Sequence, residues 1–150
     1  MSKYGVEIPP IGLPDRDFTV RRGVLAAEGQ DFEIQFFEEV LEANPRHVES
    51  LMFLGNAYTA RGEFERGLEI DLRLLRLRPQ DPIVHYNMAC SYSLLGQEDA
   101  AVSALERAIN LGYQDIEHME QDEDLANVRQ TPGYQRLLHG LRSAQETLQR

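Results

Sequence analysis

The residues best suited to act as a nucleophile or a base are four histidines and one cysteine. Histidine stands at positions 47, 85, 118 and 139, and the cysteine is Cys90. Covalent catalysis needs a base held beside the nucleophile, as in Ser-His-Asp and Cys-His arrangements. Cys90 follows His85 by five residues, which does not bring two side chains together on a helix, and no G-x-S-x-G turn is present. We therefore predict no catalytic residue and no enzyme, with His85 packed in the core and His47 capping a helix.

A second concentration of chemically able residues is the acidic stretch between residues 113 and 125. Its members are Asp115, Glu117, His118, Glu120, Asp122, Glu123 and Asp124. A calcium-binding EF-hand needs D-x-D-x-D-G spacing, and this stretch lacks the glycine. His118 and Asp122 can share one helix face, but two ligands do not make a metal site. We expect a solvated acidic corner without a metal. No G-x-G-x-x-G or G-K-[ST] phosphate loop is present, so no cofactor is expected either.

Composition limits the partners that the chain can have. It has 150 residues, 42% hydrophobic and 27% charged, and a formal net charge of −10. This charge disfavours nucleic acids and anionic membranes, because both require a cationic face. No apolar run approaches the roughly 18 residues that span a bilayer. The first residues lack the apolar core of a secretory signal, and a single cysteine permits no internal disulfide. A cytoplasmic location is therefore the expectation.

The positions of small and aromatic residues repeat along the chain. Tyr92 follows Tyr58 at the same spacing as Gly96 follows Gly62, which is a period of about 34 residues. A fixed period of this length indicates stacked structural repeats. Small residues recur where large ones would be expected in an ordinary amphipathic helix, namely at Ala89, Cys90, Ala101, Ala104 and Ala108. Small side chains let the axes of neighbouring helices approach closely, so these positions predict tight helix–helix packing.

The repeated pattern resembles the tetratricopeptide repeat, a helix–turn–helix family. The family pattern is a bulky residue, Leu-Gly, Tyr, a small residue and Pro. The first copy carries it at Leu51, Leu54-Gly55, Tyr58, Gly67 and Pro79, and the second at His85, Met88-Ala89, Tyr92, Ala101 and Ala108. The resemblance covers residues 47–112 and, in part, 30–46. Asp71 and Leu105 depart from it where the family prefers an aromatic residue. Tyr113 replaces the closing proline, so the second repeat is expected to end differently from the first.

The resemblance implies an all-α fold in which antiparallel helix–turn–helix repeats stack as a short right-handed α-solenoid with a C-terminal capping helix. Apolar spacing near 3.6 residues, Gly62 as a helix end, and the breaks before Pro45 and Pro79 agree with this. Thr131-Pro132 is the start of the capping helix, because a hydroxyl caps and proline suits the first helical position. The helices are expected at residues 31–43, 47–61, 64–77, 82–95 and 98–111, with one more near 16–28.

Three parts of the chain follow from this pattern. Residues 1–15 form an extended, proline-rich segment. Residues 16–112 form the repeats, which are clear over 47–112 and partial over 16–46. Residues 113–150 form a degenerate repeat and the capping helix. The N-terminal segment is open to two interpretations: a disordered tail, or docking of Val6, Ile8, Ile11 and Leu13 on the first helices or on a partner.

The resemblance also implies a binding groove, because the first helix of each repeat lines the concave face of such an array. Residue by residue, the candidate peptide-binding groove is Glu49, Met52, Asn56, Thr59, Ile83, Tyr86, Asn87, Cys90 and Ser93. Met52 and Tyr86 occupy the same position in consecutive repeats, so they should stand side by side. The alternative is that both pack against the terminal helix and leave no groove.

One group of such proteins grips the acidic tails of heat-shock chaperones with a two-carboxylate clamp. Asn56 and Asn87 match the amides of that clamp. Met52 and Glu117 stand where it needs cations, and a clamp without cations does not hold paired carboxylates in water. This chain is therefore not expected to bind those tails.

The predicted function is a non-enzymatic protein–protein interaction module that binds a partner peptide or helix on the concave face. The partner should be neutral to basic and carry apolar anchors, because the groove is apolar within an acidic protein. Two alternatives stay open: a small acidic assembly or secretion chaperone that shields an apolar client segment, and a structural protein that associates with itself as a homo-oligomer.

Overall fold

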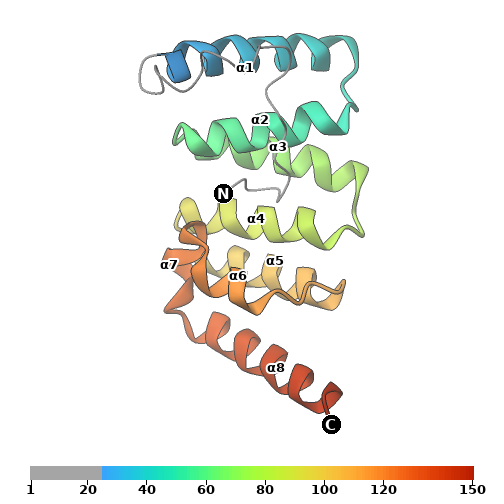
Figure 1. Ribbon diagram of the computed structural model, residues 1–150, viewed down its shortest axis with the longest axis vertical. Helices are drawn as coiled ribbons and strands as arrows, with labels where there is room; N and C mark the ends of the chain where they lie inside the picture. The colour runs from blue at the N-terminus through green and yellow to red at the C-terminus, as the bar shows by residue number, and fades with distance from the viewer. Residues whose placement is uncertain (1–24) are drawn as a thin grey trace, which may run out of the picture.

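The computed structural model describes residues 25–150, which form an elongated stack of antiparallel helices without any strand (Figure 1). The elements are α1 (Leu25–Ala43), α2 (Val48–Ala60), α3 (Phe64–Leu77), α4 (Pro82–Leu94), α5 (Glu98–Asn110), α6 (Ile116–Gln121), the short 3-10 helix η1 (Glu123–Leu125), α7 (Ala126–Arg129) and α8 (Pro132–Leu148). The fold is thus the expected all-α helical-repeat solenoid. The predicted extended segment 1–15, and the docking alternative for it, lie outside the described residues.

The first helix differs from the prediction. Two helices were expected, near 16–28 and at 31–43. Residues 16–24 lie outside the described residues, and from Leu25 to Ala43 the chain is one unbroken helix, so the expected interruption at 29–30 is absent. Gly29 does not interrupt it, because glycine in a helix interior lowers stability without preventing the helical conformation. The buried residues Ile34, Phe37 and Leu41 give the helix its apolar stripe, since they recur at spacings of three and four. Packing of this stripe on α2 stabilises α1.

Two glycines end the first helices of the two repeats in the same way. Gly62 follows α2 with φ of 76°, and Gly96 follows α4 with φ of 72°. In both turns the next backbone N–H reaches back to a tyrosine carbonyl, from Glu63 to Tyr58 at 2.8 Å and from Gln97 to Tyr92 at 2.9 Å. This is the hydrogen bond of a helix-ending motif that favours glycine. The prediction that Gly62 ends a helix is confirmed, and the turn recurs one repeat later.

Side chains cap the starts of α2, α4 and α8, as the sequence predicted for α2 and α8, and Asp115 likewise caps α6. The His47 side chain accepts from the backbone N–H of Ser50 at α2, and Thr131 accepts from that of Tyr134 at α8. Asp81 accepts from the N–H of Ile83 at α4, where Pro82 is the first helical residue. Each cap satisfies a donor that has no partner within the helix. His85 is buried, as predicted, and its Nε2 lies 2.8 Å from the Pro79 carbonyl oxygen.

The core consists of two clusters that meet at α4. One joins α1, α2 and α3 to the start of α4, and the other joins α4 and α5 to the C-terminal helices. Gly67 and Ala101 are buried where the paired helices approach, in agreement with the predicted role of small residues. Asp71 and Leu105, which both stand where the family prefers an aromatic residue, are fully buried. Asp71 compensates for its polarity by accepting a hydrogen bond of 2.5 Å from the Ser91 hydroxyl.

The C-terminal residues close the stack. The second repeat ends at Gly112, with φ of 110°, and the buried Tyr113, unlike the Arg78-Pro79 end of the first repeat. Helix α8 packs on α5 through Tyr134, Leu138 and Leu141, which are all buried. Its start at Pro132 agrees with the predicted capping helix. Within residues 25–150, no helix is long and apolar enough to cross a membrane.

Candidate functional site

Helix α2 supplies the accessible half of the predicted groove. In Figure 1 it lies in front of α3, and α6 lies in front of α5, so this view faces the first helices of the repeats. Glu49 is exposed, and Met52, Asn56 and Thr59 are half-buried. The Thr59 hydroxyl donates to the Gly55 carbonyl at 2.9 Å, which fixes its side chain against the helix. The remaining side chains give α2 an apolar and amide-bearing surface of low charge.

Helix α4 does not offer the same surface. The residues that match the α2 stripe are almost inaccessible: Tyr86 is 2% exposed, Cys90 1% and Ser93 0%. Asn87 is also fully buried, and only Ile83, at 39%, reaches solvent among the predicted groove residues of this helix. The sequence placed these side chains on the groove-facing stripe of the helix, but they do not form a continuous solvent-accessible wall.

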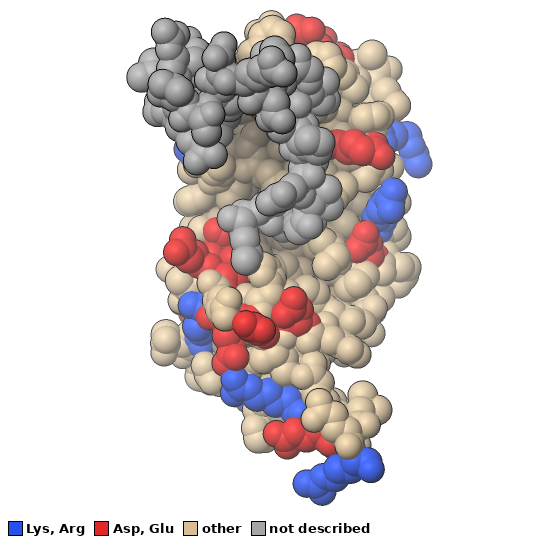
Figure 2. Space-filling view, in the orientation of Figure 1, with Lys and Arg blue, Asp and Glu red and all other residues tan. Residues whose placement is uncertain are grey.

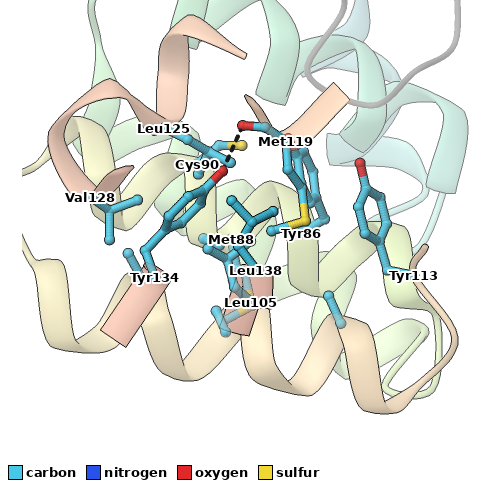
Figure 3. Close-up of a cluster of buried hydrophobic side chains, with 14 of the residues drawn as sticks. Tyr86, Met88, Cys90, Leu105, Tyr113, Met119, Leu125, Val128, Tyr134 and Leu138 are labelled. Carbon is cyan, nitrogen blue, oxygen red and sulfur yellow. Dashed lines mark hydrogen bonds between the residues drawn. The ribbon is translucent and has the colours of Figure 1, made fainter. Parts of the chain in front are cut away.

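The third, degenerate repeat contributes to this burial. Segments η1 and α7 lie against α4, the Tyr86 hydroxyl donates to Asp122 Oδ2 at 2.8 Å, and the Asn127 amide donates to the Ser93 carbonyl at 2.9 Å. Leu125 and Val128, which belong to these two segments, are fully buried in the second core cluster (Figure 3). The alternative that the terminal helix covers both Met52 and Tyr86 is therefore not what is found. The segment before α8 packs on Tyr86, and Met52 stays half-buried.

Tyr86 also packs on the residue that closes the second repeat. Its ring stacks on that of Tyr113, with centroids 4.4 Å apart and planes 14° apart, and Figure 3 shows the two rings side by side. Burial, followed by the nearby Cys90 and Asp122, raises the pKa of the Tyr86 phenol well above its ordinary value. The hydroxyl is therefore a neutral donor to Asp122 at physiological pH.

Asp122 is a junction between α4, α6 and η1. Its Oδ2 accepts from Tyr86, lies 3.7 Å from the Cys90 sulfur and lies 3.3 Å from His118 Nε2. Cys90, Asp122 and Asp124 place one ligand atom each within 4.8 Å of one another. The expectation of a solvated acidic corner is therefore wrong for Asp122, whose side chain is only 15% exposed. Because its carboxylate already accepts these hydrogen bonds, the arrangement acts as a structural tie between the three segments.

A pocket lies at the start of α4, beside the turn that leads into α6. Its volume is about 390 Å³, and its walls are Pro82, Ile83, Tyr86, Asn87, Gly112, Tyr113, Gln114, Asp115 and His118. Ile83, Tyr86 and Asn87 were predicted groove residues, whereas the remainder were not. The repeat period ends near residue 113, so no pattern in the sequence indicated that the 112–118 turn would face α4.

The pocket and its surroundings are acidic. Asp115 and Glu117 are exposed there, and no lysine or arginine lies among the described residues that line it. Figure 2 shows several acidic side chains gathered near the middle of this face. Such a field attracts cations and repels carboxylates, which agrees with the expectation that the chain does not grip an acidic tail.

Comparison with known proteins places this geometry in a family. Two sequence models of the tetratricopeptide repeat match residues 50–83 and 83–111. A chloroplastic protein of Arabidopsis thaliana is 29% identical over 119 residues, which are 77% of this chain and 35% of that protein. The peroxisomal targeting signal receptor of Pichia angusta is 32% identical over 80 residues, which are 53% of this chain and 14% of the receptor. Superkiller protein 3 of Saccharomyces cerevisiae is 29% identical over 83 residues, which are 55% of this chain and 6% of that protein.

The chain spans about a third or less of the length of these curated relatives. The matched residues begin within α2 and end just after α5, so they coincide with the two helix pairs that share the glycine-ended turn. The periodic residues, the helix–turn–helix geometry and both matches agree: residues 50–111 of this chain are tetratricopeptide repeats.

Proposed function

We propose that this chain is a non-enzymatic interaction module that binds a peptide or helix of a partner protein along α2 and the start of α4. The tetratricopeptide repeat is generally a non-catalytic fold that mediates protein–protein interaction. The observation that carries the proposal is the half-buried stripe of Met52, Asn56 and Thr59 on α2, together with the exposed Ile83 at the start of α4. This surface suits an extended or helical peptide that places one apolar side chain against Met52.

The chemistry of this surface favours a neutral to basic partner. Glu49 and Asp115 are both exposed, within a protein of net charge −10. Complementary charge accelerates association and selects among partners more than it raises affinity. The Tyr86 hydroxyl and the Cys90 thiol already contact Asp122, so the proposed role of these two residues is to support the wall of the site.

A partner protein is first isolated with the full chain. The experiment then measures how single substitutions in this chain change its affinity for that partner. Met52→Ala should weaken binding by about 1–2 kcal/mol if Met52 is an anchor. Glu49→Gln should cost less than about 1 kcal/mol and mainly reduce the salt dependence. The matched control is Arg76→Gln, which removes a charge from an exposed position on α3 and should leave affinity unchanged. Loss of binding in Arg76→Gln but not in Met52→Ala would place the partner on the opposite face and refute the proposal.

The relatives support this proposal in general terms only. One is named as a receptor for a peroxisomal targeting signal, and recognition of a peptide signal by a related repeat fits a peptide-binding role here. The proposal includes a cytoplasmic location, with which a single buried cysteine is compatible.

A second candidate is self-association through α1, and it rests on a separate observation. Phe32 is 73% exposed and Phe36 43% exposed. They lie four residues apart and therefore on one face of the helix. Large exposed apolar side chains that adjoin one another are typical of interaction surfaces. If α1 joins two copies, the wild-type chain sediments as a dimer and Phe32→Ser sediments as a monomer. A wild-type chain that stays monomeric at high concentration would refute this candidate.

A further inference from the structure

Within residues 25–150, the side-chain amide of Asn87 forms no hydrogen bond, although it is fully buried. Its exposed fraction is 0%, and neither its nitrogen nor its oxygen has a partner in that part of the chain. A buried amide without partners loses its bonds to water and gains nothing in return, so it is uncommon in a folded protein. Asn87 is part of the wall of the pocket at the start of α4. The unpaired amide therefore indicates a partner that arrives from outside the described residues.

The chemistry of the amide defines what that partner offers. A primary amide presents two donors and one acceptor side by side, which complements the C=O and N–H of a peptide backbone. The pocket volume of about 390 Å³ accommodates a residue of an extended chain. Ile83 lines the same pocket and is 39% exposed, so an incoming residue can contact its side chain.

The rim of the pocket defines the side chain of that residue. Asp115 Oδ1 accepts from the backbone N–H of His118 at 3.0 Å, which fixes the carboxylate at the start of α6. Asp115 forms no ion pair within residues 25–150, and its neighbour Glu117 is also exposed. Pro82 and Ile83, which belong to the start of α4, offer apolar contacts in the wall of the same pocket. A long aliphatic side chain that ends in a cation suits both the carboxylate and these apolar residues, since its stem packs and its head stays in water.

We propose that this pocket is a specificity subsite for one arginine or lysine residue of an extended partner peptide, with Asn87 paired to its backbone and Asp115 to its cation. The subsite deepens the proposed function and rests on it. In this arrangement the basic residue of the peptide binds beside the 112–118 turn. The apolar anchor of the peptide binds to the stripe on α2. The partner is thus an extended segment whose apolar residue lies on α2 and whose cationic residue lies beside α4.

The test uses the full chain and three small probes that share one backbone. The probes are the N-acetyl, N-methylamide derivatives of arginine, citrulline and glutamate, each with two peptide groups. Binding is measured by NMR from the side-chain amide of Asn87 and the backbone amide of Asp115. We expect saturable shifts with the arginine derivative, with affinity about threefold to fivefold higher than for its neutral isostere citrulline and higher still than for glutamate. Equal affinity for all three probes, or no shift at Asn87, would overturn the proposal.

Two variants and one control separate a binding role from a structural one. Asp115→Asn keeps the helix-capping oxygen and should remove the preference for arginine over citrulline. Asn87→Leu should abolish binding of every probe without lowering the melting temperature, because it removes an unpaired amide. The control Asp99→Asn makes the same change in the first turn of α5, outside the pocket, and should leave binding unchanged. If Asn87→Leu lowers the melting temperature while the probes still bind, Asn87 is structural and the proposal fails.

The remaining outcomes identify other occupants or separate this proposal from the proposed function. If a chain without residues 1–14 binds the arginine probe more than about tenfold tighter, the chain's own N-terminal segment is the occupant and an external partner is ruled out for this pocket. If the probes fail but Met52→Ala still weakens the isolated partner, the subsite is wrong and the proposed function stands. If Met52→Ala has no effect while the probes behave as expected, the subsite stands without the α2 groove.

Discussion

Helices α2 and α4 occupy equivalent places in consecutive repeats but differ in what their matching residues do. Met52 and Tyr86 hold the same position in their repeats, yet the first is half-buried and the second is 2% exposed. The glycine-ended turns that follow the two helices are alike, with φ of 76° and 72°. The repeat pattern thus determines the backbone of both helices, whereas the packing of neighbouring segments determines which side chains remain accessible. A groove inferred from repeat positions alone is therefore correct only where nothing folds back on it.

Removal of the C-terminal helix should have the largest effect on stability, and it should affect the second core cluster more than the first. A chain that ends at Gln130 loses Tyr134, Leu138 and Leu141 from the second core cluster. The apolar surface of α5 would then meet water, and an end repeat without its polar cover aggregates or binds hydrophobic dyes. The first cluster, around α2, does not contain α8.

We expect dye binding together with a clear loss of helical signal on mild heating, measured by fluorescence and circular dichroism. The control is a chain that ends at Ser143, which keeps all three buried residues. A monomeric truncated protein with an unchanged melting temperature would mean that α8 is a tail and not a cap.

The next effect concerns two buried residues at equivalent positions in the second helix of each repeat, α3 and α5. Leu105→Ala should lower the free energy of unfolding by about 2–5 kcal/mol, because it leaves a cavity in the core. Asp71→Ala should cost about 1–3 kcal/mol, since the Ser91 hydroxyl loses its acceptor. Urea unfolding of both variants measures the difference. A larger loss for Asp71→Ala would show that the first repeat depends on its polar pair more than the second depends on its leucine.

Much of the fold could be predicted from the sequence, because the repeat period, Gly62 and Thr131-Pro132 are local signals. The start of α1 at Leu25 could not, since the apolar spacing of Ile34, Phe37 and Leu41 begins only after Gly29. The burial of Tyr86 could not be predicted either. It depends on Asp122, 36 residues away and beyond the last residue in register. For the same reason the repeat pattern did not indicate that the side chains of α4 are buried where the matching side chains of α2 stay accessible.

The contact between Tyr86 and Asp122 gives a smaller and pH-dependent effect. Tyr86→Phe should lower stability by about 1.5 kcal/mol at neutral pH, since a hydrogen bond to a charged acceptor is lost. In the wild type the pKa of Tyr86 is raised above the ordinary value of 10.0. The folded protein therefore keeps the proton while the unfolded chain releases it above about pH 10. The stability that the buried phenol contributes is complete below that pH and is lost as the pH rises.

Urea unfolding at about pH 9 and about pH 11 measures this loss. The difference in stability between wild type and Tyr86→Phe should shrink over this range. Tyr58→Phe is the matched control in the first repeat, where the phenol donates to the partly exposed Glu38 at 2.5 Å. At neutral pH, Tyr58→Phe should lower the free energy of unfolding by less than Tyr86→Phe does. A difference that stays constant with pH would contradict the inferred burial of the Tyr86 hydroxyl.

The smallest effect tests the feature that the two repeats share. Gly62→Ala and Gly96→Ala should each cost about 1 kcal/mol, because an L-residue is strained at positive φ. In neither place would the added methyl group meet an atom within 4 Å, so the cost should be backbone strain alone and equal in both turns. Gly140→Ala is the control: it lies inside α8 with open space around it and should raise stability by about 0.5–1 kcal/mol. Thermal unfolding of the three variants measures these differences. A much larger cost at Gly96 than at Gly62 would mean that the fold-back of η1 and α7 also constrains the turn after α4, and that the two repeats differ in backbone as well as in exposure.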